Sequence, residues 1–468
     1  MSLYKFPIAQ TPNWQVVMAT MPSDEPVSNF GMGLTAYIIG DLLPKRKNNE
    51  TVRETIEKII QIPVASKLYI RPTWRQMQSQ RGKLDFFEHW QITLELAEKY
   101  NKRVGFRVML NNPDIEESAL PDFVLAEVPQ YTFAGKWERT HPLTRQFESY
   151  SAPHYHHPYF LEALDEFDAL LAEKYNGHAC IEYMDTYMHG FWGEGHSWPF
   201  EDSPFPDHAA ALETWLRIFE MQRAHWNKTP LASNLQPDIN NVGNDELVRR
   251  ALETGEWLRS DTIFIEPQQI ELAGNRPPHI AFISEVGMSD GAPESLCLEN
   301  GLPHTENIIA HVRDVGANYW SLWNWHNIHA DHVMNYYRQY PDGINRLGRV
   351  IGYRLRPAWV WTYGEPHLAG LIVALSNDGI SGVPGVVRLT LLDQSNHPIS
   401  ESTLEAGHPT PHQVRLVSLK LPAGVGWEGT RLKAELIVKG VSHSLRWACR
   451  ESLNPDGSLT LRQMEYLQ

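Results

Sequence analysis

Ala179-Cys-Ile-Glu-Tyr-Met-Asp185, followed by Thr-Tyr-Met-His-Gly-Phe-Trp-Gly193-Glu194-Gly-His196, is the stretch that is most informative about the fold. Its first part is a short apolar run that ends on a carboxylate, as a buried strand would. The residues after Asp185 are too rich in glycine and aromatic rings to continue as a strand or a helix. In α/β barrels, chemistry takes place where parallel strands end and the following loops begin. We therefore expect a barrel strand that ends at Asp185 and a functional loop that carries Glu194.

Strand-like and helix-like patterns alternate on both sides of this stretch, over about 340 residues. Eight strand candidates are each followed by a helical or an irregular stretch, which predicts an α/β fold with a (β/α)8 TIM barrel. A doubly wound open sheet would instead need a Gly-rich phosphate turn after its first strand, and Gly31 and Gly33 lie at the start of that strand. The predicted strands span residues 32–40, 67–71, 103–110, 179–185, 230–233, 261–265, 279–285 and 317–323. The predicted helices span residues 50–61, 86–100, 159–174, 209–224, 245–257 and 304–315.

The pattern changes near Leu347. From Arg349 onward, short alternating runs are separated by glycine, proline and asparagine turns, and no helical period appears. Such a pattern is typical of an antiparallel β-sandwich, here of about 120 residues. The sequence therefore predicts a (β/α)8 barrel domain over residues 1–348 and a C-terminal antiparallel β-sandwich domain over residues 349–468. A homodimer is compatible with this organisation, with the second domain as the expected contact.

Composition and charge exclude several classes of partner. The 468 residues carry a formal net charge of −15 without a run of lysine or arginine, which argues against nucleic acid. No stretch is long and apolar enough to span a bilayer, so no membrane partner is expected. The N-terminus lacks the apolar core of a secretory signal, which leaves the cytoplasm and the periplasm as expected locations. Cys180, Cys297 and Cys449 have no metal-type spacing and imply no disulfide framework.

Three carboxylates fall at or just after the ends of predicted strands. Asp185 ends the fourth strand, Glu194 lies in the loop after it, and Glu285 ends the seventh. In a closed barrel these strand ends face one another across the mouth, within reach of one ligand. A site that cleaves sugars needs two carboxyl groups that flank the scissile bond. It also needs flat apolar faces that pack against the sugar ring, which the many tryptophans near the strand ends could supply.

Two segments carry a resemblance to a known family: Phe191-Trp-Gly-Glu-Gly-His196 and Ile283-Ser-Glu-Val-Gly287. They resemble the large clan (clan A) of (β/α)8 glycoside hydrolases, and look close to an uncharacterised bacterial branch with a Gly-x-Trp-Gly-Glu loop after strand four. In that clan the acid/base follows strand four and a glutamate nucleophile ends strand seven. The resemblance implies a retaining glycoside hydrolase that acts on a carbohydrate, with Glu285 as nucleophile. The clan's Asn-Glu pair at the fourth strand end is replaced here by Met184-Asp185, so that either Asp185 or Glu194 could be the acid/base.

We favour Glu194 as the acid/base, because the rings of Phe191, Trp192 and Trp198 would disfavour its charged form by desolvation and keep it a proton donor. Asp185 would then hold a substrate hydroxyl or orient an arginine. Arginines at strand ends can contact an acidic sugar, organise the nucleophile or form salt bridges inside the barrel. Core filling is expected to account for at least one tryptophan of the eighth strand. The residues expected to contact the substrate are Arg71, Trp74, Arg107, Trp192, His196, Trp320, Trp323, Asn324, Trp325 and His326.

Two alternatives of other classes remain at this point. A non-catalytic carbohydrate-binding barrel would keep the aromatic cleft without the paired acids. A metal-dependent hydrolase would draw on the histidines, but barrel metallohydrolases place a His-x-His on the first strand, and residues 33–40 hold no histidine. We therefore expect neither a metal nor another cofactor. The long irregular stretch after strand three is expected to be a functional loop over the site, with His154, His156 and His157 either solvated or lining the pocket.

Overall fold

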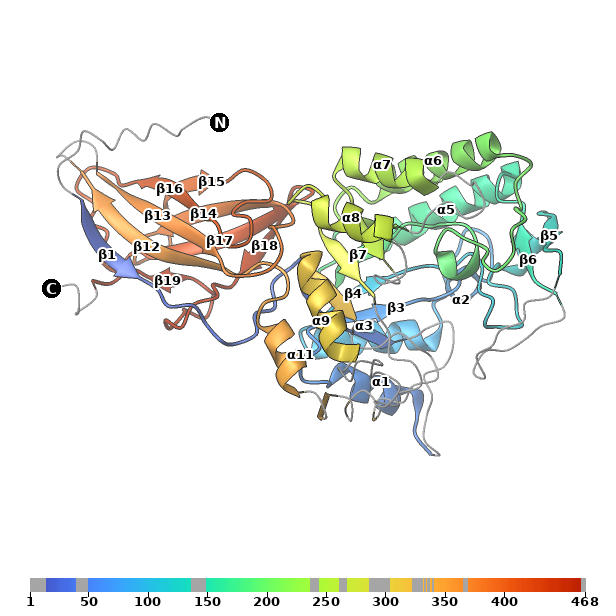
Figure 1. Ribbon diagram of the computed structural model, residues 1–468, viewed down its shortest axis with the longest axis horizontal. Helices are drawn as coiled ribbons and strands as arrows, with labels where there is room; N and C mark the ends of the chain where they lie inside the picture. The colour runs from blue at the N-terminus through green and yellow to red at the C-terminus, as the bar shows by residue number, and fades with distance from the viewer. Residues whose placement is uncertain are drawn as a thin grey trace. The chain divides into compact units, whose positions relative to one another are not determined.

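Figure 1 shows the computed structural model of the chain, which describes residues 14–38, 49–135, 149–235, 244–260, 267–285, 304–321, 331, 334, 337–338, 341–364 and 369–463. Two compact units can be distinguished. The barrel unit comprises the described residues of Gly33–Arg276 and Phe282–Leu347. The sheet unit comprises the described residues of Met1–Met32, Pro277–Ala281 and Gly348–Gln468.

A closed barrel of parallel strands forms the core of the barrel unit, which confirms the predicted (β/α)8 barrel. The order of the strands around the barrel follows their order along the chain, as consecutive parallel βα units require. The strands are β2 (Gly33–Ile38), β3 (Lys67–Ile70), β4 (Arg103–Phe106), β7 (Ile181–Asp185), β8 (Leu231–Asn234), β9 (Trp257–Ser260), β10 (Phe282–Ser284) and β11 (Tyr319–Ser321), and β11 pairs with β2.

Helices connect these strands, and α1 (Val52–Ile60) shows how local sequence sets their bounds. Thr51 and Glu54 form a capping box, in which each side chain accepts a hydrogen bond from the backbone of the other. Ile56 and Ile59 on the opposite side of the helix are buried. The others are α2 (Trp74–Met77), α3 (Glu88–Lys99), α4 (Asp122–Leu125), α5 (Pro158–Tyr175), α6 (His208–His225), α7 (Asn244–Thr254), α8 (Pro267–Asn275), α9 (His304–Asp314) and α11 (Pro341–Gly348). Figure 1 shows α5, α6 and α7 side by side. Within the described ranges, every helix is too short or too polar to cross a membrane.

The sixth strand of the barrel differs from the sequence prediction. Helix α7 ends at Thr254 rather than at Trp257, because Gly255 adopts φ +77° and closes the helix with a turn. The strand β9 then begins at Trp257. The segment 261–265, in which the strand was predicted, lies outside the described residues. The loop predicted between strands three and four contains α4 and a two-stranded hairpin of β5 (Gln130–Thr132) and β6 (Ser151–Pro153).

Aromatic and charged side chains fill the barrel interior. Gly105 in β4 makes room for one of them, since a Cβ there would lie 2.3 Å from Cζ of Tyr183. Near the amino ends of the strands, Glu182 accepts hydrogen bonds from Lys67 Nζ and Tyr319 OH, both at 2.8 Å. Burial lowers the pKa of Lys67. The interior is therefore polar at this end as well as at the opposite end, where the carboxylates lie.

The sheet unit contains two antiparallel sheets, consistent with the predicted β-sandwich. One has the order β1 (Gln15–Ala19), β12 (Leu355–Tyr363), β13 (Gly370–Asn377) and β16 (Val414–Lys420). The other has the order β15 (Pro398–Thr403), β14 (Val386–Leu392), β17 (Arg431–Val438) and β18 (Val441–Leu445), with β19 (Leu459–Thr460) beside β17. Because β1 pairs with β12, residues that the sequence grouped with the barrel contact the C-terminal strands.

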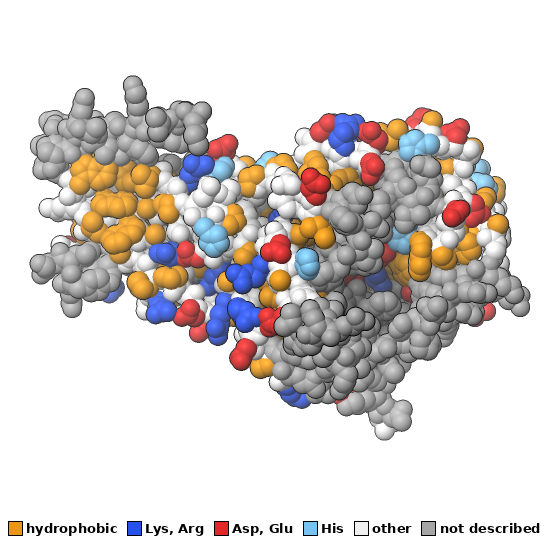
Figure 2. All heavy atoms as spheres, viewed as in Figure 1, with side chains coloured by type: hydrophobic (Ala, Val, Ile, Leu, Met, Phe, Trp, Pro, Cys, Tyr) orange, Lys and Arg blue, Asp and Glu red, His pale blue; other side chains and the backbone are white. Residues whose placement is uncertain are grey.

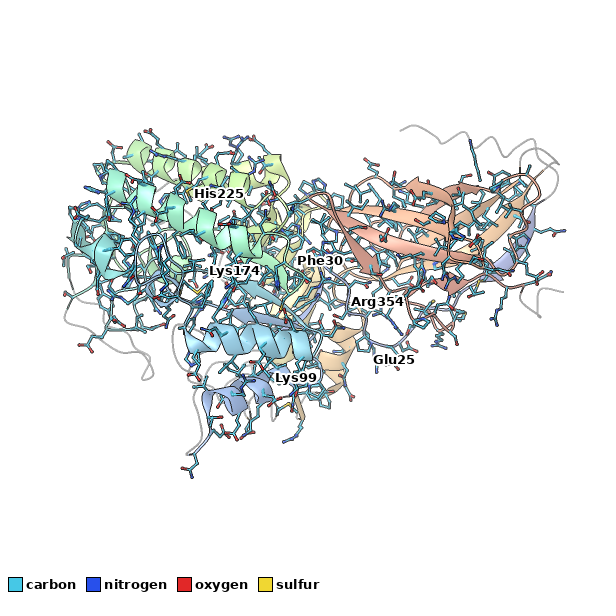
Figure 3. All side chains as sticks on the ribbon, turned by 180° about the vertical axis from the view of Figure 1, so that it is seen from behind. Glu25, Phe30, Lys99, Lys174, His225 and Arg354 are labelled. Carbon is cyan, nitrogen blue, oxygen red and sulfur yellow. The ribbon has the colours of Figure 1, made fainter. Side chains whose placement is uncertain are left out.

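Contacts between distant parts of the sequence tie the sheet unit together. Arg354 Nη2 donates to the backbone oxygens of Ser23 and Glu25, each at 2.8 Å, and Figure 3 labels Arg354 and Glu25. Figure 2 shows hydrophobic side chains gathered on one face of this unit. Trp359 and Leu416 are among the large hydrophobic residues that are exposed in the described part of this unit.

Candidate active site

Strand ends place the three predicted carboxylates in the barrel unit. Asp185 is the last residue of β7, and Glu285 directly follows β10, where its backbone N–H donates to Ser260 O at 2.9 Å. Glu194 follows the short 3₁₀ turn Phe191–Gly193. Asp185 and Glu285 are each 2% exposed, whereas the side chain of Glu194 is 14% exposed. Glu194 is thus the most accessible of the three.

Arg259 of β9 joins two of these carboxylates. Its Nη1 lies 3.4 Å from Oδ2 of Asp185, and its Nη2 forms an ion pair with Oε2 of Glu285. Nη2 also donates to the hydroxyl of Tyr37 at 2.6 Å. The guanidinium lies 4.6 Å from the centroid of the Tyr69 ring, within cation–π distance. Arg259 is fully buried.

Arg107, which follows β4, joins Asp185 to the third carboxylate. Its Nε lies 3.2 Å from Oδ2 of Asp185, and its Nη1 lies 3.4 Å from Oε1 of Glu194. Nη1 also donates to the backbone oxygen of Trp192 at 2.9 Å. The five side chains Glu285, Arg259, Asp185, Arg107 and Glu194 therefore alternate in charge, and we call them the charge row.

The loop that carries Glu194 is closed by its own backbone. The N–H of Phe191 donates to His196 O at 2.8 Å. Gly190 adopts φ +75°, and a Cβ on it would lie 1.9 Å from the same oxygen. From the neighbouring strand β8, Nδ2 of Asn234 donates to the backbone oxygen of Glu194 at 3.0 Å. Glu194 therefore lies on a tight turn that is anchored to the barrel on both sides.

His196 reaches back to Glu194 from the end of this loop. Its Nε2 lies 3.3 Å from Oε2 of Glu194. The backbone N–H of Trp198 donates to its Nδ1 at 3.2 Å, so Nδ1 must carry a lone pair. In the neutral ring the proton is then on Nε2, from which it is donated to Glu194. Glu194 is thus contacted by Arg107 on one oxygen and by His196 on the other.

The predicted aromatic contacts have different outcomes. Trp192 is partly exposed, and its Nε1 donates to Oδ2 of Asp114 at 2.6 Å, which fixes the ring beside the Glu194 loop. The prediction for Trp74 was wrong. Its ring is fully buried between Phe160 and Phe167, and its Nε1 donates to Gln78, so it has no face for a ligand.

Of the residues predicted for the end of the eighth strand, the structure describes those up to Ser321. Tyr319 points into the barrel, where its hydroxyl contacts Glu182. Neighbouring residues of a strand face opposite sides, so Trp320, which is 1% exposed, faces away from the barrel interior. Trp320 therefore fills the core, the role expected of at least one tryptophan here, and its predicted contact with the substrate was wrong. Four other predicted contacts lie outside the described residues: Trp323, Asn324, Trp325 and His326.

Arg71 and the histidines complete the predicted set. Arg71 directly follows β3, is 5% exposed and interacts electrostatically with Tyr37, so it lies near the charge row. His154 and His156 of the long loop contact each other by their rings, with centroids 5.6 Å apart. Within the described ranges, no three histidine, cysteine or acidic side chains are arranged to hold a metal ion.

Sequence reasoning missed Arg259, Tyr37 and Tyr69. Two features of the sequence could have pointed to Arg259. Gly255 is a typical helix terminator, so a strand could begin soon after it. An arginine within a buried strand is unusual and suggests a specific role. The two tyrosines were assigned to strands, but nothing in the sequence distinguished their hydroxyls from those of other core tyrosines. Tyr69 OH donates to Oδ2 of Asp185. Burial raises the pKa of both tyrosines, so both hydroxyls are protonated near neutrality.

No protein-family model matches the sequence, and no curated protein matches it. Among solved structures, a glycoside hydrolase is 8% identical, with a TM-score of 0.39 over 68% of this chain and 99% of that one. The catalytic domain of beta-amylase from Paenibacillus polymyxa is 9% identical, with a TM-score of 0.46 over 66% of this chain and 98% of that one. Endo-glycoceramidase II from Rhodococcus sp. is 12% identical, with a TM-score of 0.37 over 87% of this chain and all of that one (100%). At these values, the chemistry of the site has to be inferred from its own residues.

Proposed function

We propose that the protein is a glycoside hydrolase that cleaves the bond between sugar units of a carbohydrate by means of Glu285 and Glu194. The observation that carries the proposal is the charge row, in which carboxylates from β7, its loop and β10 meet at the carboxyl ends of the barrel strands. Active sites of such barrels lie at this end. Two carboxyl groups of separate origin are what cleavage of a glycosidic bond requires.

The surroundings of the two glutamates suit different roles. Glu285 pairs with the buried guanidinium of Arg259, which stabilises the ionised form that a nucleophile needs. Glu194 lies on a loop and is more accessible, so it can reach the oxygen of a glycosidic bond. We therefore assign the nucleophile to Glu285 and the acid/base to Glu194.

A retaining reaction follows from these roles in two steps. Glu194 donates its proton to the leaving oxygen while Glu285 attacks the anomeric carbon, which gives a covalent glycosyl-enzyme. Glu194, now a carboxylate, then takes a proton from the water that displaces Glu285. The product keeps the anomeric configuration of the substrate, which NMR of the first product formed would show. Inversion would instead require a water between the two carboxyl groups.

The test is hydrolysis of a panel of aryl glycosides and of plant and algal polysaccharides. We expect Glu285→Gln to lower kcat by at least about a thousandfold, because the amide cannot act as a nucleophile. Glu173→Gln is the matched control, since Glu173 is exposed on α5 and contacts no residue of the site. Azide should restore turnover to a Glu285→Gly variant and give a glycosyl azide. Full activity of Glu285→Gln would disprove the assignment of the nucleophile.

A carbohydrate-binding barrel without turnover is the second candidate. The observation that favours it is the burial of Glu285, which is 2% exposed and paired with Arg259. In that case the wild-type protein would bind a polysaccharide of the panel without releasing sugar from it. Glu285→Gln would then bind like the wild type. Measurable hydrolysis by the wild type that Glu285→Gln lacks would exclude this candidate.

A further inference from the structure

We propose that Arg259 is a positioning residue that fixes the carboxylate of Glu285, and that Asp185 is the counter-ion of this arginine rather than the proton donor. This assignment rests on the proposed function, since it concerns the same carboxylates. Arg259 would not contact the substrate itself, but it would determine how Glu285, which does, is held. The assignment also separates the role of Asp185 from that of Glu194.

Arg259 can fix Glu285 because its contacts are made by one rigid group. Nη1 faces Oδ2 of Asp185 at 3.4 Å, and Nη2 faces Glu285 and the hydroxyl of Tyr37, the latter at 2.6 Å. A guanidinium is planar and carries its donors in a fixed fork. Two carboxylates that share this fork are therefore held at a set separation and orientation. A lysine at the same position could pair with either carboxylate but could not set the geometry of both.

Burial makes these pairings obligatory. Arg259 is 0% exposed, so its charge is stable there only while carboxylates compensate for it. Conversely, without the arginine Asp185 and Glu285 would lose the cation that both of them contact. Among the described residues, the other titratable and charged groups that face this region are Tyr37 of β2, Tyr69 and Arg71 next to or in β3, Arg107 after β4, and Tyr183 of β7.

Asp185 acts as the counter-ion through one of its two oxygens, Oδ2. Its Oδ2 accepts hydrogen bonds from Tyr69 OH and from Nε of Arg107, and pairs with Arg259. A general acid must present a proton to the glycosidic oxygen, and Asp185, which is 2% exposed, is less accessible to a ligand than the side chain of Glu194, which is 14% exposed. Asp185 therefore orients both arginines, and through them Glu285 and Glu194. Arg107 contacts Glu194 and Arg259 contacts Glu285, and both arginines contact Oδ2 of Asp185.

The first experiment is the pH profile of kcat/KM for Arg259→Gln and Arg259→Lys, with an aryl glycoside that the wild type hydrolyses. We expect Arg259→Gln to shift the acid limb upward by about one pH unit, because Glu285 loses the cation that favours its ionised form. We expect kcat to fall about a hundredfold with KM within about threefold, since the loss concerns the transition state. Arg259→Lys should keep the position of the acid limb and recover part of kcat.

Arg103→Gln is the matched control. Arg103 begins β4 at the other end of the barrel, where its Nη1 lies 3.8 Å from Glu182, so it tests the loss of a barrel arginine in general. It should leave the acid limb in place. Tyr37→Phe removes one hydrogen bond from Nη2 of Arg259 and should shift the limb in the same direction as Arg259→Gln, by less. If Arg259→Gln does not fold, the position of the acid limb in Arg259→Lys and Tyr37→Phe tests the role of Arg259 instead.

The second experiment needs no turnover. The thermal stabilities of Arg259→Gln, Glu285→Gln and the double variant at pH 8 form a cycle that measures the coupling between the two side chains. We expect the double variant to regain part of the stability that Arg259→Gln loses, because neutralising Glu285 removes the charge left without a partner. Additive losses, together with an unmoved acid limb in every folded variant, would overturn the role of Arg259. Full activity of Glu285→Gln would instead refute the proposed function, whatever the cycle shows.

Discussion

Nε2 of His196 lies 3.3 Å from Oε2 of Glu194, and the tautomer that makes it a donor is set by the backbone N–H of Trp198. The imidazole is therefore oriented so that Nε2 faces the carboxylate of Glu194. His196 thus helps to hold this carboxylate in place from the end of its own loop.

Replacing His196 by phenylalanine should therefore lower the rate. Oε2 of Glu194 loses its contact with Nε2 of His196, so the carboxylate is held less firmly. We expect a fall of roughly tenfold in kcat/KM at neutral pH, as for the loss of one hydrogen bond of about 1.4 kcal/mol. His178→Phe, outside the site, is the control. An unchanged kcat/KM in His196→Phe would contradict this role for His196.

Gly190 allows a separate test of the Glu194 loop. In Gly190→Ala the new Cβ would meet His196 O at 1.9 Å, and the residue would keep a left-handed φ of +75°. We expect a loss of roughly 1–3 kcal/mol in the free energy of unfolding, from denaturant titration, and a large loss of activity. Gly424→Ala is the control, because Gly424 has φ +80° but no atom within 4 Å of the added Cβ. It should share the backbone strain and keep full activity. Equal activity in the two variants would show that the closed loop is not needed for catalysis.

Most of the barrel could be predicted from the sequence because its helices and strands have clear periods. The apolar run that ends at Asp185 is β7, and the capping box of Thr51 and Glu54 marks the start of α1. The sixth strand was predicted at residues 261–265 rather than at Trp257–Ser260, because the observed strand is short and contains an arginine, and the apolar segment after it fits a strand pattern better.

The candidate site could be predicted in part. Asp185 and Glu285 were identified because each ends a predicted strand, where barrel chemistry lies. Arg107 was named as a contact from inside the predicted strand 103–110, whereas β4 ends one residue before it. Arg259 was missed with its strand. Trp74 was assigned to the mouth by its position after β3, but it begins a short helix whose buried face packs against Phe160 and Phe167. Which side of an element a ring occupies depends on tertiary contacts that a single sequence does not contain.

Because His189 is buried, we expect the free energy of unfolding to fall in acid. His189 is 1% exposed between Tyr155 and Trp215, and burial lowers its pKa to about 3. In the unfolded chain its pKa is about 6.5, so between pH 6.5 and 3 the unfolded state binds a proton that the folded state does not. The free energy of unfolding should fall in this window by up to about 1.4 kcal/mol per pH unit from this residue. Denaturant titrations at pH 7.5 and 5.0 should show a smaller fall for His189→Phe than for the wild type. An equal fall in both proteins would contradict the prediction.

His225 should have the opposite dependence. Its Nδ1 lies 2.7 Å from Oδ2 of Asp168, a fully buried carboxylate that also accepts from Nε1 of Trp226 at 2.9 Å, and this hydrogen bond raises the pKa of His225. Figure 3 labels His225 on α6. Because the raised pKa means that the folded state binds the proton more tightly, the stabilisation is complete below the unfolded pKa and is lost as pH rises through the folded one. His225→Gln should therefore lose more stability, relative to the wild type, at pH 5.5 than at pH 8.5. Of the two histidines, only His225 has a carboxylate within hydrogen-bond distance in the described structure. If His225→Gln lost the same free energy of unfolding at both pH values, Asp168 would not be holding a charged imidazole.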